Sequence, residues 1–285
     1  MQTQLLPRRG GSVAYDDRGQ GPLVVCVPGL GDLRAEYRLL APALEAAGFR
    51  VVTMDLRGHG ESSTGWPDYS KTAIGADIVA LIRHLGGPAL VIGASYAAGA
   101  AVCAAAEAPD LIAGVVLIGP FVRDHGTGWA QRLLYSALFA GPWGAAAWST
   151  YFPRLFPSRK PADFVSYARA LRLNLRERGR LGALRAMMTQ SSADSEAALG
   201  HVRARALVVM GTRDPDFAAP RAEAEWIAAR LGGEISMIEG AGHYPHVEMP
   251  EQAGPAVVEF CRRIVQGAPR GEQEEAVHGS TSGVE

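Results

Sequence analysis

The amino-acid sequence predicts an α/β fold in which a mostly parallel sheet carries helices on both of its faces. Two observations lead to this prediction. Short, almost continuous apolar runs alternate with alanine- and leucine-rich segments of helical spacing, and the first four runs end at glycine, proline or aspartate. The alternation is interrupted once and then resumes near the end of the chain. Strands of a parallel sheet are buried on both faces, so they carry continuous apolar runs.

The first half of the chain contains four of these apolar runs and two helical segments. The helical segments lie at 35–47 and 72–85. The predicted strands are L-V-V-C-V (23–27), V-V-T-M-D-L (51–56), A-L-V-I-G (89–93) and V-V-L-I-G (115–119).

Strand signals disappear between about 121 and 202. This stretch contains the proline-broken sequence Y-F-P-R-L-F-P and an arginine-rich, helix-like run at 161–189. We therefore predict an all-helical insertion. The alternation then resumes with strands at 206–211 and 235–239 and helices near 220–231 and 250–266.

These segments predict three parts. An α/β core comprises residues 1–120 and 203–266, and a helical cap comprises residues 121–202. The remaining tail, 267–285, is polar and poor in hydrophobic residues. We expect the tail to be disordered, because such a segment buries too little apolar surface to offset the entropy of ordering it.

The composition argues against several classes of partner. With a net charge of −1, 48% hydrophobic and 20% charged residues, the chain has no electrostatic attraction to nucleic acid or to an anionic membrane. No apolar run approaches the ~20 residues of a membrane span, and the first residues lack the apolar stretch of a signal peptide. The cysteines Cys26, Cys103 and Cys261 are far apart in apolar surroundings, which indicates reduced, buried thiols. We expect a soluble cytoplasmic protein that binds neither nucleic acid nor membrane.

Ser95 lies in the sequence G-A-S-Y-A (93–97), between a strand-like and a helix-like segment. The pattern is nearly G-x-S-x-G, with Ala97 in place of the last glycine. A sharp turn here would lift the hydroxyl at the carboxyl edge of the sheet, where open α/β sheets bind ligands. Taken alone, the motif also fits an ordinary serine in a small-residue linker.

A nucleophilic serine needs a base, and the base needs a carboxylate that orients it. His243 lies in G-A-G-H-Y-P-H-V-E-M-P (240–250), directly after the last predicted strand. Asp214 lies in G-T-R-D-P-D-F (211–217), directly after the strand before it. The carboxyl ends of parallel strands meet at one edge of a sheet, so we predict that Ser95, Asp214 and His243 form a catalytic triad.

Other residues compete for these roles. Asp216 is the alternative to Asp214, and His246 is the alternative to His243. For His59, in the sequence R-G-H-G, we expect a structural hydrogen bond. His125 either lines the substrate pocket or is a solvated loop residue.

The glycine-rich turn V-P-G-L-G-D (27–32) follows the first predicted strand. The backbone N–H groups of Leu30 and Tyr96 would form an oxyanion hole there, each contributing typically ~2.7–4 kcal/mol. The alternative is a tight turn without chemistry. Three polar residues just beyond it are expected to begin a surface helix, unless one of them reaches the substrate: Asp32, Arg34 and Tyr37.

Five segments together resemble the α/β-hydrolase superfamily, in its serine-nucleophile branch with a helical cap. They are P-G-L-G-D, D-L-R-G-H-G-E-S-S (55–63), G-A-S-Y-A, G-T-R-D and G-A-G-H-Y-P-H-V-E-M-P-E, and the similarity covers roughly residues 11–266. The resemblance implies an eight-stranded sheet in which Ser95 attacks a carbonyl, His243 takes and returns the proton, and Asp214 holds the histidine.

The resemblance also bears on the chemistry. Epoxide hydrolases and haloalkane dehalogenases of this fold use an aspartate nucleophile, so Ser95 argues against both. Two departures from the family pattern, Pro28-Gly29 in place of His-Gly and Ala97 at the end of the serine motif, concern substrate and rate more than class.

We therefore predict a serine hydrolase that cleaves an ester, thioester or similar acyl bond of a small to medium hydrophobic substrate. No cofactor or metal is expected, because no H-E-x-x-H or comparable spacing occurs. The expected substrate contacts are Gly29, Phe121, His125, Trp129, Trp143 and Tyr244. The aromatic residues of the cap, which include Trp148, could instead simply pack the cap on the core.

The same triad supports other activities, which the sequence leaves open. They are C–C bond hydrolysis, perhydrolysis, a non-hydrolytic cyclase or lyase step, and ligand binding by a receptor that retains the triad. The oligomeric state is also open between a monomer and a homodimer.

Overall fold

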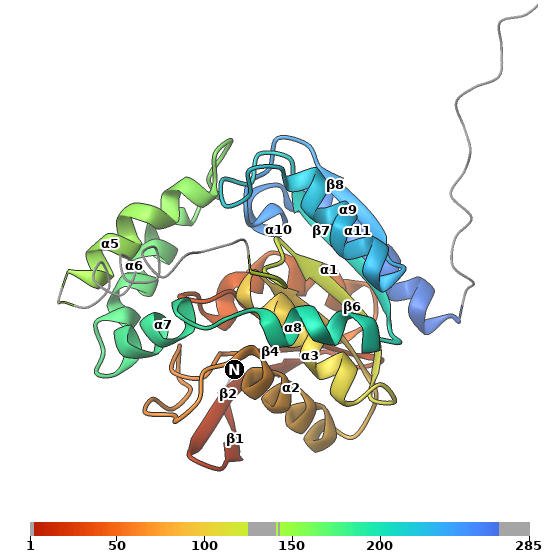
Figure 1. The fold of residues 1–285 in the computed structure, drawn as a ribbon, viewed down its shortest axis with the longest axis horizontal. Coiled ribbons are helices and arrows are strands. Elements are labelled where there is room, and N and C mark those ends of the chain that lie inside the picture. The colour runs from red at the N-terminus through yellow and green to blue at the C-terminus, as the bar shows by residue number, and fades with distance from the viewer. Residues whose placement is uncertain (1–2, 125–140, 142, 268–285) are drawn as a thin grey trace, which may run out of the picture.

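The computed structural model of the chain describes residues 3–124, 141 and 143–267. At its centre, the described residues form one sheet of eight strands in the order β1-β2-β4-β3-β5-β6-β7-β8 (Figure 1). Strands β3 to β8 are mutually parallel, whereas β2 is antiparallel to both β1 and β4. The predicted fold class, a mostly parallel eight-stranded sheet, is confirmed.

The strands occupy short segments of five to eight residues. They are β1 (Gln4–Arg8), β2 (Gly11–Arg18), β3 (Leu23–Val27), β4 (Arg50–Met54), β5 (Ala89–Ala94), β6 (Ile112–Ile118), β7 (Arg205–Gly211) and β8 (Glu234–Ile238). Six of these correspond to the predicted apolar runs. The hairpin of β1 and β2 lies at the edge of the sheet and is only partly buried, so no apolar run marks it in the sequence.

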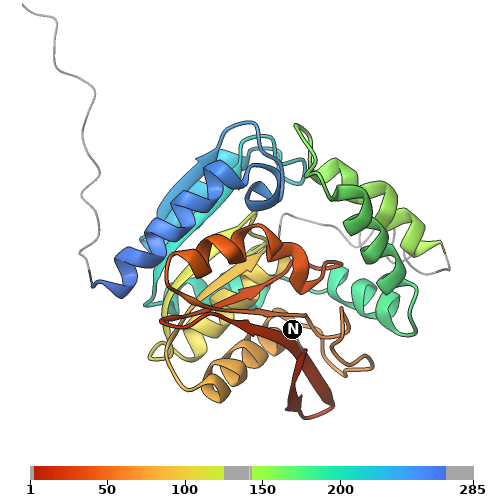
Figure 2. The ribbon, with the colours of Figure 1, turned by 180° about the vertical axis from the view of Figure 1, so that it is seen from behind.

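Helices cover both faces of the sheet (Figures 1 and 2). On one face, Val25 and Val91 pack in the same apolar cluster as side chains of α2 (Lys71–Leu85), α3 (Tyr96–Glu107) and α9 (Pro220–Leu231). On the other face, Val24 and Ile92 pack with α1 (Leu40–Ala46) and α11 (Pro250–Val265). Neighbouring residues of a strand point to opposite faces, so each buried strand contributes to both clusters.

The predicted helix at 35–47 is divided in two, as a 3₁₀ helix at Arg34–Arg38 followed by α1. A continuous helix would place the ring of Pro42 against the carbonyl group of Arg38, whereas a helix that begins at Leu40 holds Pro42 in its first turn. Tyr37 is fully buried and Asp32 is 1% exposed, so the expectation of a surface helix beginning with these residues is wrong.

The described part of 121–202 contains helices and no strand. They are α5 (Gly144–Tyr151), a 3₁₀ turn at Phe152–Leu155, α6 (Phe164–Leu175), α7 (Arg180–Met188), α8 (Ala193–Ala198) and a 3₁₀ turn at Leu199–His201. The predicted helical run at 161–189 consists of two helices: the first ends at Leu175, and Gly179, with a positive φ of 89°, directly precedes the second. Helices α5, α6 and α7 lie together on one side of the sheet, whereas α8 packs on α2 and α3 (Figures 1 and 2).

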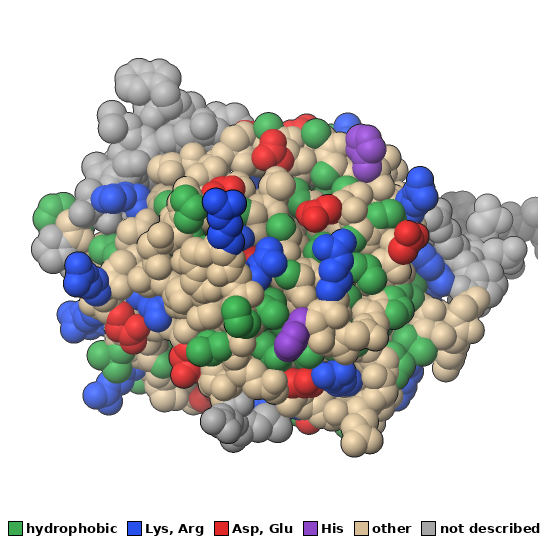
Figure 3. All heavy atoms as spheres, turned by 90° about the horizontal axis from the view of Figure 1, so that it is seen from below, with side chains coloured by type: hydrophobic (Ala, Val, Ile, Leu, Met, Phe, Trp, Pro, Cys, Tyr) green, Lys and Arg blue, Asp and Glu red, His purple; other side chains and the backbone are tan. Residues whose placement is uncertain are grey.

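The described surface carries side chains of both charges. On the face in Figure 3, basic and acidic side chains lie interspersed with apolar ones. Within the described ranges, no helix is both long and apolar enough to cross a membrane. The three cysteines are free and buried, as predicted. The predicted disordered tail lies outside the described residues, apart from Gly267.

Gly93 keeps β5 close to α3, and its replacement should disturb both. A Cβ atom at Gly93 would lie 2.5 Å from the carbonyl oxygen of Ala97 and 2.8 Å from its carbonyl carbon. Because backbone atoms cannot move aside as a side-chain end can, we expect Gly93→Ala to lower the free energy of unfolding by about 1–3 kcal/mol. Thermal unfolding measures the effect.

Gly182 in α7 is the matched control. A Cβ there meets nothing within 4 Å, so Gly182→Ala should leave stability unchanged or raise it by about 1 kcal/mol, as alanine does in a helix interior. Equal melting temperatures for the Gly93→Ala variant and the unaltered chain would contradict the close approach of β5 and α3.

Candidate active site

Ser95 occupies a strained turn between β5 and α3. Its φ is 53° and its ψ is −119°, and among the described residues it is the only non-glycine with positive φ. Its neighbours hold this conformation: the Ser95 N–H donates to the carbonyl of Ile118 at 2.8 Å, and the Phe121 N–H donates to the carbonyl of Ser95 at 3.2 Å. Such strain costs of order 1–3 kcal/mol and is characteristic of functional sites. Ala97 lies within α3 with no positive φ, so its methyl group fits the turn.

Asp214 and His243 meet at the carboxyl edge of the sheet. The Nδ1 atom of His243 lies 2.8 Å from Oδ2 of Asp214, and both side chains are buried. The loops after β7 and β8 are joined by a hydrogen bond from the Arg213 N–H to the carbonyl of Ala241 at 2.9 Å. Contact through Nδ1 leaves Nε2 as the imidazole atom that can accept a proton from a nucleophile.

Phe121 connects this pair with Ser95. Its N–H is hydrogen-bonded to the carbonyl of Ser95, and its ring centroid lies 5.7 Å from that of His243. Gly119 also borders the histidine, since a Cβ there would lie 3.1 Å from Nδ1. Ser95 and His243 thus both border the short segment that follows β6, and Asp214 is joined to His243.

Asp216 is close to the same imidazole. Its Oδ2 lies 3.7 Å from Nδ1 of His243, its N–H donates to Asp214 Oδ1 at 3.0 Å, and its Oδ1 accepts a hydrogen bond from the Tyr151 hydroxyl. Burial disfavours the charged imidazolium, but the carboxylates of Asp214 and Asp216 outweigh burial and raise the pKa of His243 to about 9. The 2.8 Å contact identifies Asp214 as the direct partner.

The same three side chains are the one group of potential metal ligands in the described ranges, with ligand atoms within 4.8 Å of one another. The direct contact between Asp214 and His243 already joins two of these ligand atoms. The donor set therefore fits a hydrogen-bonded aspartate–histidine pair.

The loop after β3 lies directly against Ser95. A Cβ atom at Gly29 would lie 3.2 Å from the Cβ of Ser95 and 2.6 Å from the hydroxyl of Tyr244. Neither the Leu30 nor the Tyr96 N–H donates to another group of the described part of the chain. Both N–H groups are therefore free to donate to another group, as the predicted oxyanion hole requires.

His59 supports this loop. Its Nε2 accepts a hydrogen bond from the Gly31 N–H at 3.0 Å, and its Nδ1 lies 2.9 Å from the carbonyl oxygen of Arg57. Burial lowers the pKa of His59 to about 4, so the ring is neutral and can accept. The predicted structural hydrogen bond is confirmed.

Aromatic side chains surround the serine and the histidine. The ring centroid of Phe217 lies 4.8 Å from that of Phe121, and the ring of Tyr244 meets that of His243 edge-on at 4.9 Å. Trp148 packs against the loop after β3 (residues 28–32), called the oxyanion loop below after the predicted role of Leu30, since a Cβ at Gly31 would lie 2.5 Å from its ring.

Among the described residues, the predicted substrate contact Trp143 does not join this group. Trp143 is 56% exposed and neighbours Gly141 rather than the serine loop, because it precedes α5 where no core side chain covers it. His125 and Trp129 lie outside the described residues.

The segment inserted between β6 and β7 also holds the histidine loop, which sequence reasoning missed. The carbonyl of Leu155 accepts a hydrogen bond from the His243 N–H at 3.0 Å. Glu248 accepts from the Gly242 N–H at 2.6 Å and from the Ser158 N–H at 2.7 Å. The bonds of Leu155 with His243 and of Ser158 with Glu248 join segments about 90 residues apart, and the groups that Leu155 and Ser158 contribute are backbone groups, which carry no sequence signal.

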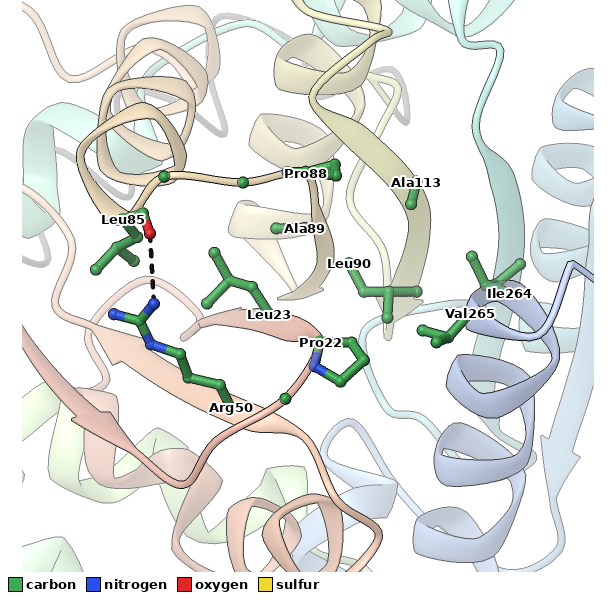
Figure 4. Close-up of a pocket in the computed structure, with 13 residues that line it drawn as sticks. Pro22, Leu23, Arg50, Leu85, Pro88, Ala89, Leu90, Ala113, Ile264 and Val265 are labelled. Atoms are coloured by element: carbon green, nitrogen blue, oxygen red, sulfur yellow. Dashed lines mark hydrogen bonds between the residues drawn. The ribbon is translucent and has the colours of Figure 1, made fainter.

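A separate hollow of about 490 Å³ lies at the opposite edge of the sheet (Figure 4). It is lined by the amino ends of β3 and β5 and by Val265 at the end of α11. Its one charged side chain, Arg50, donates hydrogen bonds to Asp17 and to the carbonyl of Leu85. The hollow therefore offers no reactive group.

The structure is thus an α/β fold with a strained serine at the turn between a parallel strand and the helix that follows it. The sequence profile of the alpha/beta hydrolase family matches residues 24–253, which is more than half of the chain. The chain belongs to this family.

Individual relatives are similar over shorter stretches. A Mycobacterium tuberculosis protein named as a non-heme bromoperoxidase, BpoC, is 38% identical over 109 residues, which cover 38% of this chain and 41% of the relative. Epoxide hydrolase B of the same organism is 39% identical over 106 residues, covering 36% of this chain and 30% of the relative. The matches thus span less than half the length of these relatives.

Among solved structures, a thermophilic esterase from Thermogutta terrifontis superposes with a TM-score of 0.76. It is 25% identical, and the alignment covers 93% of this chain and 99% of the esterase.

Proposed function

We propose that the protein is a serine hydrolase that cleaves an ester, thioester or similar acyl bond through an acyl-enzyme. The observation that carries the proposal is the strained Ser95 at the carboxyl edge of the sheet, with Phe121 in contact both with it and with His243 of the buried Asp214–His243 pair. Backbone strain at a single polar residue is retained where it serves a function. Membership of the family and similarity to an esterase support the same class.

In the first half of the reaction, the Ser95 hydroxyl attacks the carbonyl carbon and His243 takes its proton. The bond between carbon and leaving group breaks, and the imidazolium returns the proton to the leaving oxygen or sulfur. Asp214 holds Nδ1 and stabilises the positive charge on the ring while it exists. The Leu30 and Tyr96 N–H groups stabilise the negative charge on the carbonyl oxygen.

In the second half, His243 removes a proton from water, and the water attacks the acyl carbon. The bond to Ser95 Oγ breaks, and the proton returns to the serine. Water and ester are thereby converted to acid and alcohol, and the protein is restored.

The substrate is proposed to be small to medium and hydrophobic. Phe121, Phe217 and Tyr244 supply apolar surface next to the histidine, and Trp148 closes over the oxyanion loop. We further propose that residues 121–202 act as a cap over the site, since Leu155 and Tyr151 from this segment bond to the histidine loop and to Asp216.

A panel of p-nitrophenyl esters with acyl chains of two to sixteen carbons tests the function. We expect kcat/KM to be highest for short or medium chains and to fall for the longest ones. Absence of hydrolysis across the whole panel, with a folded protein, would contradict the proposed activity.

Perhydrolysis is a second candidate, favoured by the similarity to a protein named as a non-heme bromoperoxidase. In this reaction hydrogen peroxide replaces water in the second half and gives a peracid, which can oxidise bromide. Bromination of monochlorodimedone in acetate, bromide and peroxide measures it. Bromination faster than ester hydrolysis would favour perhydrolysis as the main reaction.

A further inference from the structure

Three buried polar residues lie behind the oxyanion loop and have no part in the reaction described above. Asp32 and Glu36 come from the segment after β3, and His246 comes from α10 (Pro245–Glu248). Each is about 1% exposed. Ionisable side chains are seldom buried unless they bond to specific groups, so their contacts indicate what they do.

Glu36 contacts both loops of the site. Its Oε2 accepts a hydrogen bond from the Gly29 N–H at 2.8 Å, and its Oε1 lies 3.0 Å from Nε2 of His246. Gly29 precedes the predicted oxyanion donor Leu30, and His246 lies three residues after His243. One carboxyl group is therefore hydrogen-bonded to the loop of the predicted oxyanion hole and also in contact with the loop that carries the proposed base.

His246 is fixed between two aromatic rings. The ring of Tyr37 lies 5.2 Å from it and the ring of Tyr244 lies 6.0 Å from it, centroid to centroid. The Tyr37 hydroxyl donates to the carbonyl of Val27, at the end of β3, at 2.8 Å. The imidazole is thus packed against a side chain that is anchored to the sheet.

The contacts of Gly29 determine where the Leu30 N–H points. The Gly29 N–H donates to Glu36, and the Gly29 carbonyl accepts from the Asp32 N–H at 3.2 Å. In a trans peptide the N–H of Leu30 points opposite to the carbonyl of Gly29. Because hydrogen bonds hold both the N–H and the carbonyl group of Gly29, the Leu30 N–H is directed away from Asp32.

We propose that Glu36 and His246 form a positioning pair that holds the Gly29–Leu30 peptide in the orientation needed to stabilise the oxyanion. The inference rests on the proposed serine hydrolase activity and adds two residues to it. Both act through the loop and touch no substrate.

The charges support this role. Burial raises the pKa of Glu36 to about 8, against the opposing effects of the Gly29 N–H, His243 and Arg38. Burial, together with the positive charges of Arg38 and His243, lowers the pKa of His246 to about 3. At neutral pH both side chains are therefore mainly uncharged, and no full negative charge behind the loop opposes the one that develops on the oxyanion.

The test compares two substitutions of Glu36 in the full chain. Glu36→Gln keeps an oxygen that can accept from the Gly29 N–H, whereas Glu36→Met has a similar length and no such oxygen. We expect Glu36→Met to lower kcat for p-nitrophenyl butyrate by roughly 10²-fold, the size of a lost oxyanion donor, with little change in KM. Glu36→Gln should recover most of this loss, and a boronic acid inhibitor should weaken in parallel with kcat.

Glu223→Met is the matched control. Glu223 is buried, as Glu36 is, but it lies on α9 and forms an ion pair with Arg123. It should lower the melting temperature and leave kcat unchanged. If Glu36→Met does not fold, His246→Phe replaces the imidazole with a ring that fits between the two tyrosines, and kcat should again fall without a change in KM.

The outcomes separate the two proposals. A kcat equal to that of the unaltered chain in folded Glu36→Met, or in His246→Phe, would overturn the positioning role while ester hydrolysis stands. An equal loss in the Met and Gln variants would also overturn it. If the unaltered chain hydrolyses no ester, and a fluorophosphonate does not label Ser95, the proposed function itself fails.

Discussion

Replacement of Ser95 by alanine is expected to abolish ester hydrolysis in a protein that remains folded. Without the hydroxyl no acyl-enzyme forms, and His243 and the oxyanion donors alone give only residual catalysis. We expect kcat for p-nitrophenyl butyrate to fall by roughly 10⁴-fold or more. Circular dichroism and thermal unfolding should change little, because alanine keeps the Cβ atom and the backbone contacts of Ser95 with Ile118 and Phe121.

Two further serine variants sharpen this result. Ser95→Gly should be equally inactive but more stable than Ser95→Ala, because glycine adopts a φ of 53° without strain. Ser166→Ala on α6 removes a serine whose hydroxyl donates to the carbonyl of Asp163, and it should keep full activity. Undiminished hydrolysis by Ser95→Ala would show that Ser95 is not the nucleophile.

Replacement of Asp214 by asparagine is expected to have the second largest effect and to change the pH profile. The base must be neutral, and Asp214 and Asp216 raise the pKa of His243 to about 9 against the effect of burial. In the unaltered chain, kcat/KM should therefore rise with pH through a range above the ordinary histidine value of about 6.5. Asp214→Asn should move this rise to lower pH, because it removes the nearest negative charge.

The value of kcat on the high-pH plateau of this profile distinguishes the role of Asp214 from that of Asp216. Asp214→Asn should lower kcat on the plateau by roughly 10⁴-fold, since the asparagine cannot hold the required tautomer. Asp216→Asn should shift the profile in the same direction but keep most of the plateau, because Asp216 is 3.7 Å from Nδ1. If Asp216→Asn costs as much as Asp214→Asn, the orienting carboxylate is Asp216.

The fold could be predicted where burial of a strand requires a continuous run of apolar residues. Strands such as Leu23–Val27 and Ala89–Ala94 are buried on both faces, so every residue in them is apolar or small. The β1–β2 hairpin could not be predicted in this way, because an edge strand such as Gln4–Arg8 leaves most of its side chains in contact with water. The division at Leu39 depends on the effect of Pro42, which the spacing of apolar residues does not reveal.

The site could be predicted as far as its residues follow strands directly. Ser95, Asp214 and His243 each come within a few residues of a strand end, so topology alone brings them to one edge. The supports of the site could not be predicted, because Leu155 acts through its backbone carbonyl. Glu36 and His246 meet only after residues 210 positions apart are folded together.

Peptide mass spectrometry after labelling with a fluorophosphonate tests the central claim most directly. This reagent phosphonylates an activated serine and needs no knowledge of the substrate. We predict one adduct per chain, located on Ser95, that is lost in Ser95→Ala and slowed in His243→Ala. An adduct on another residue, or ester hydrolysis that persists without any adduct on Ser95, would contradict the account.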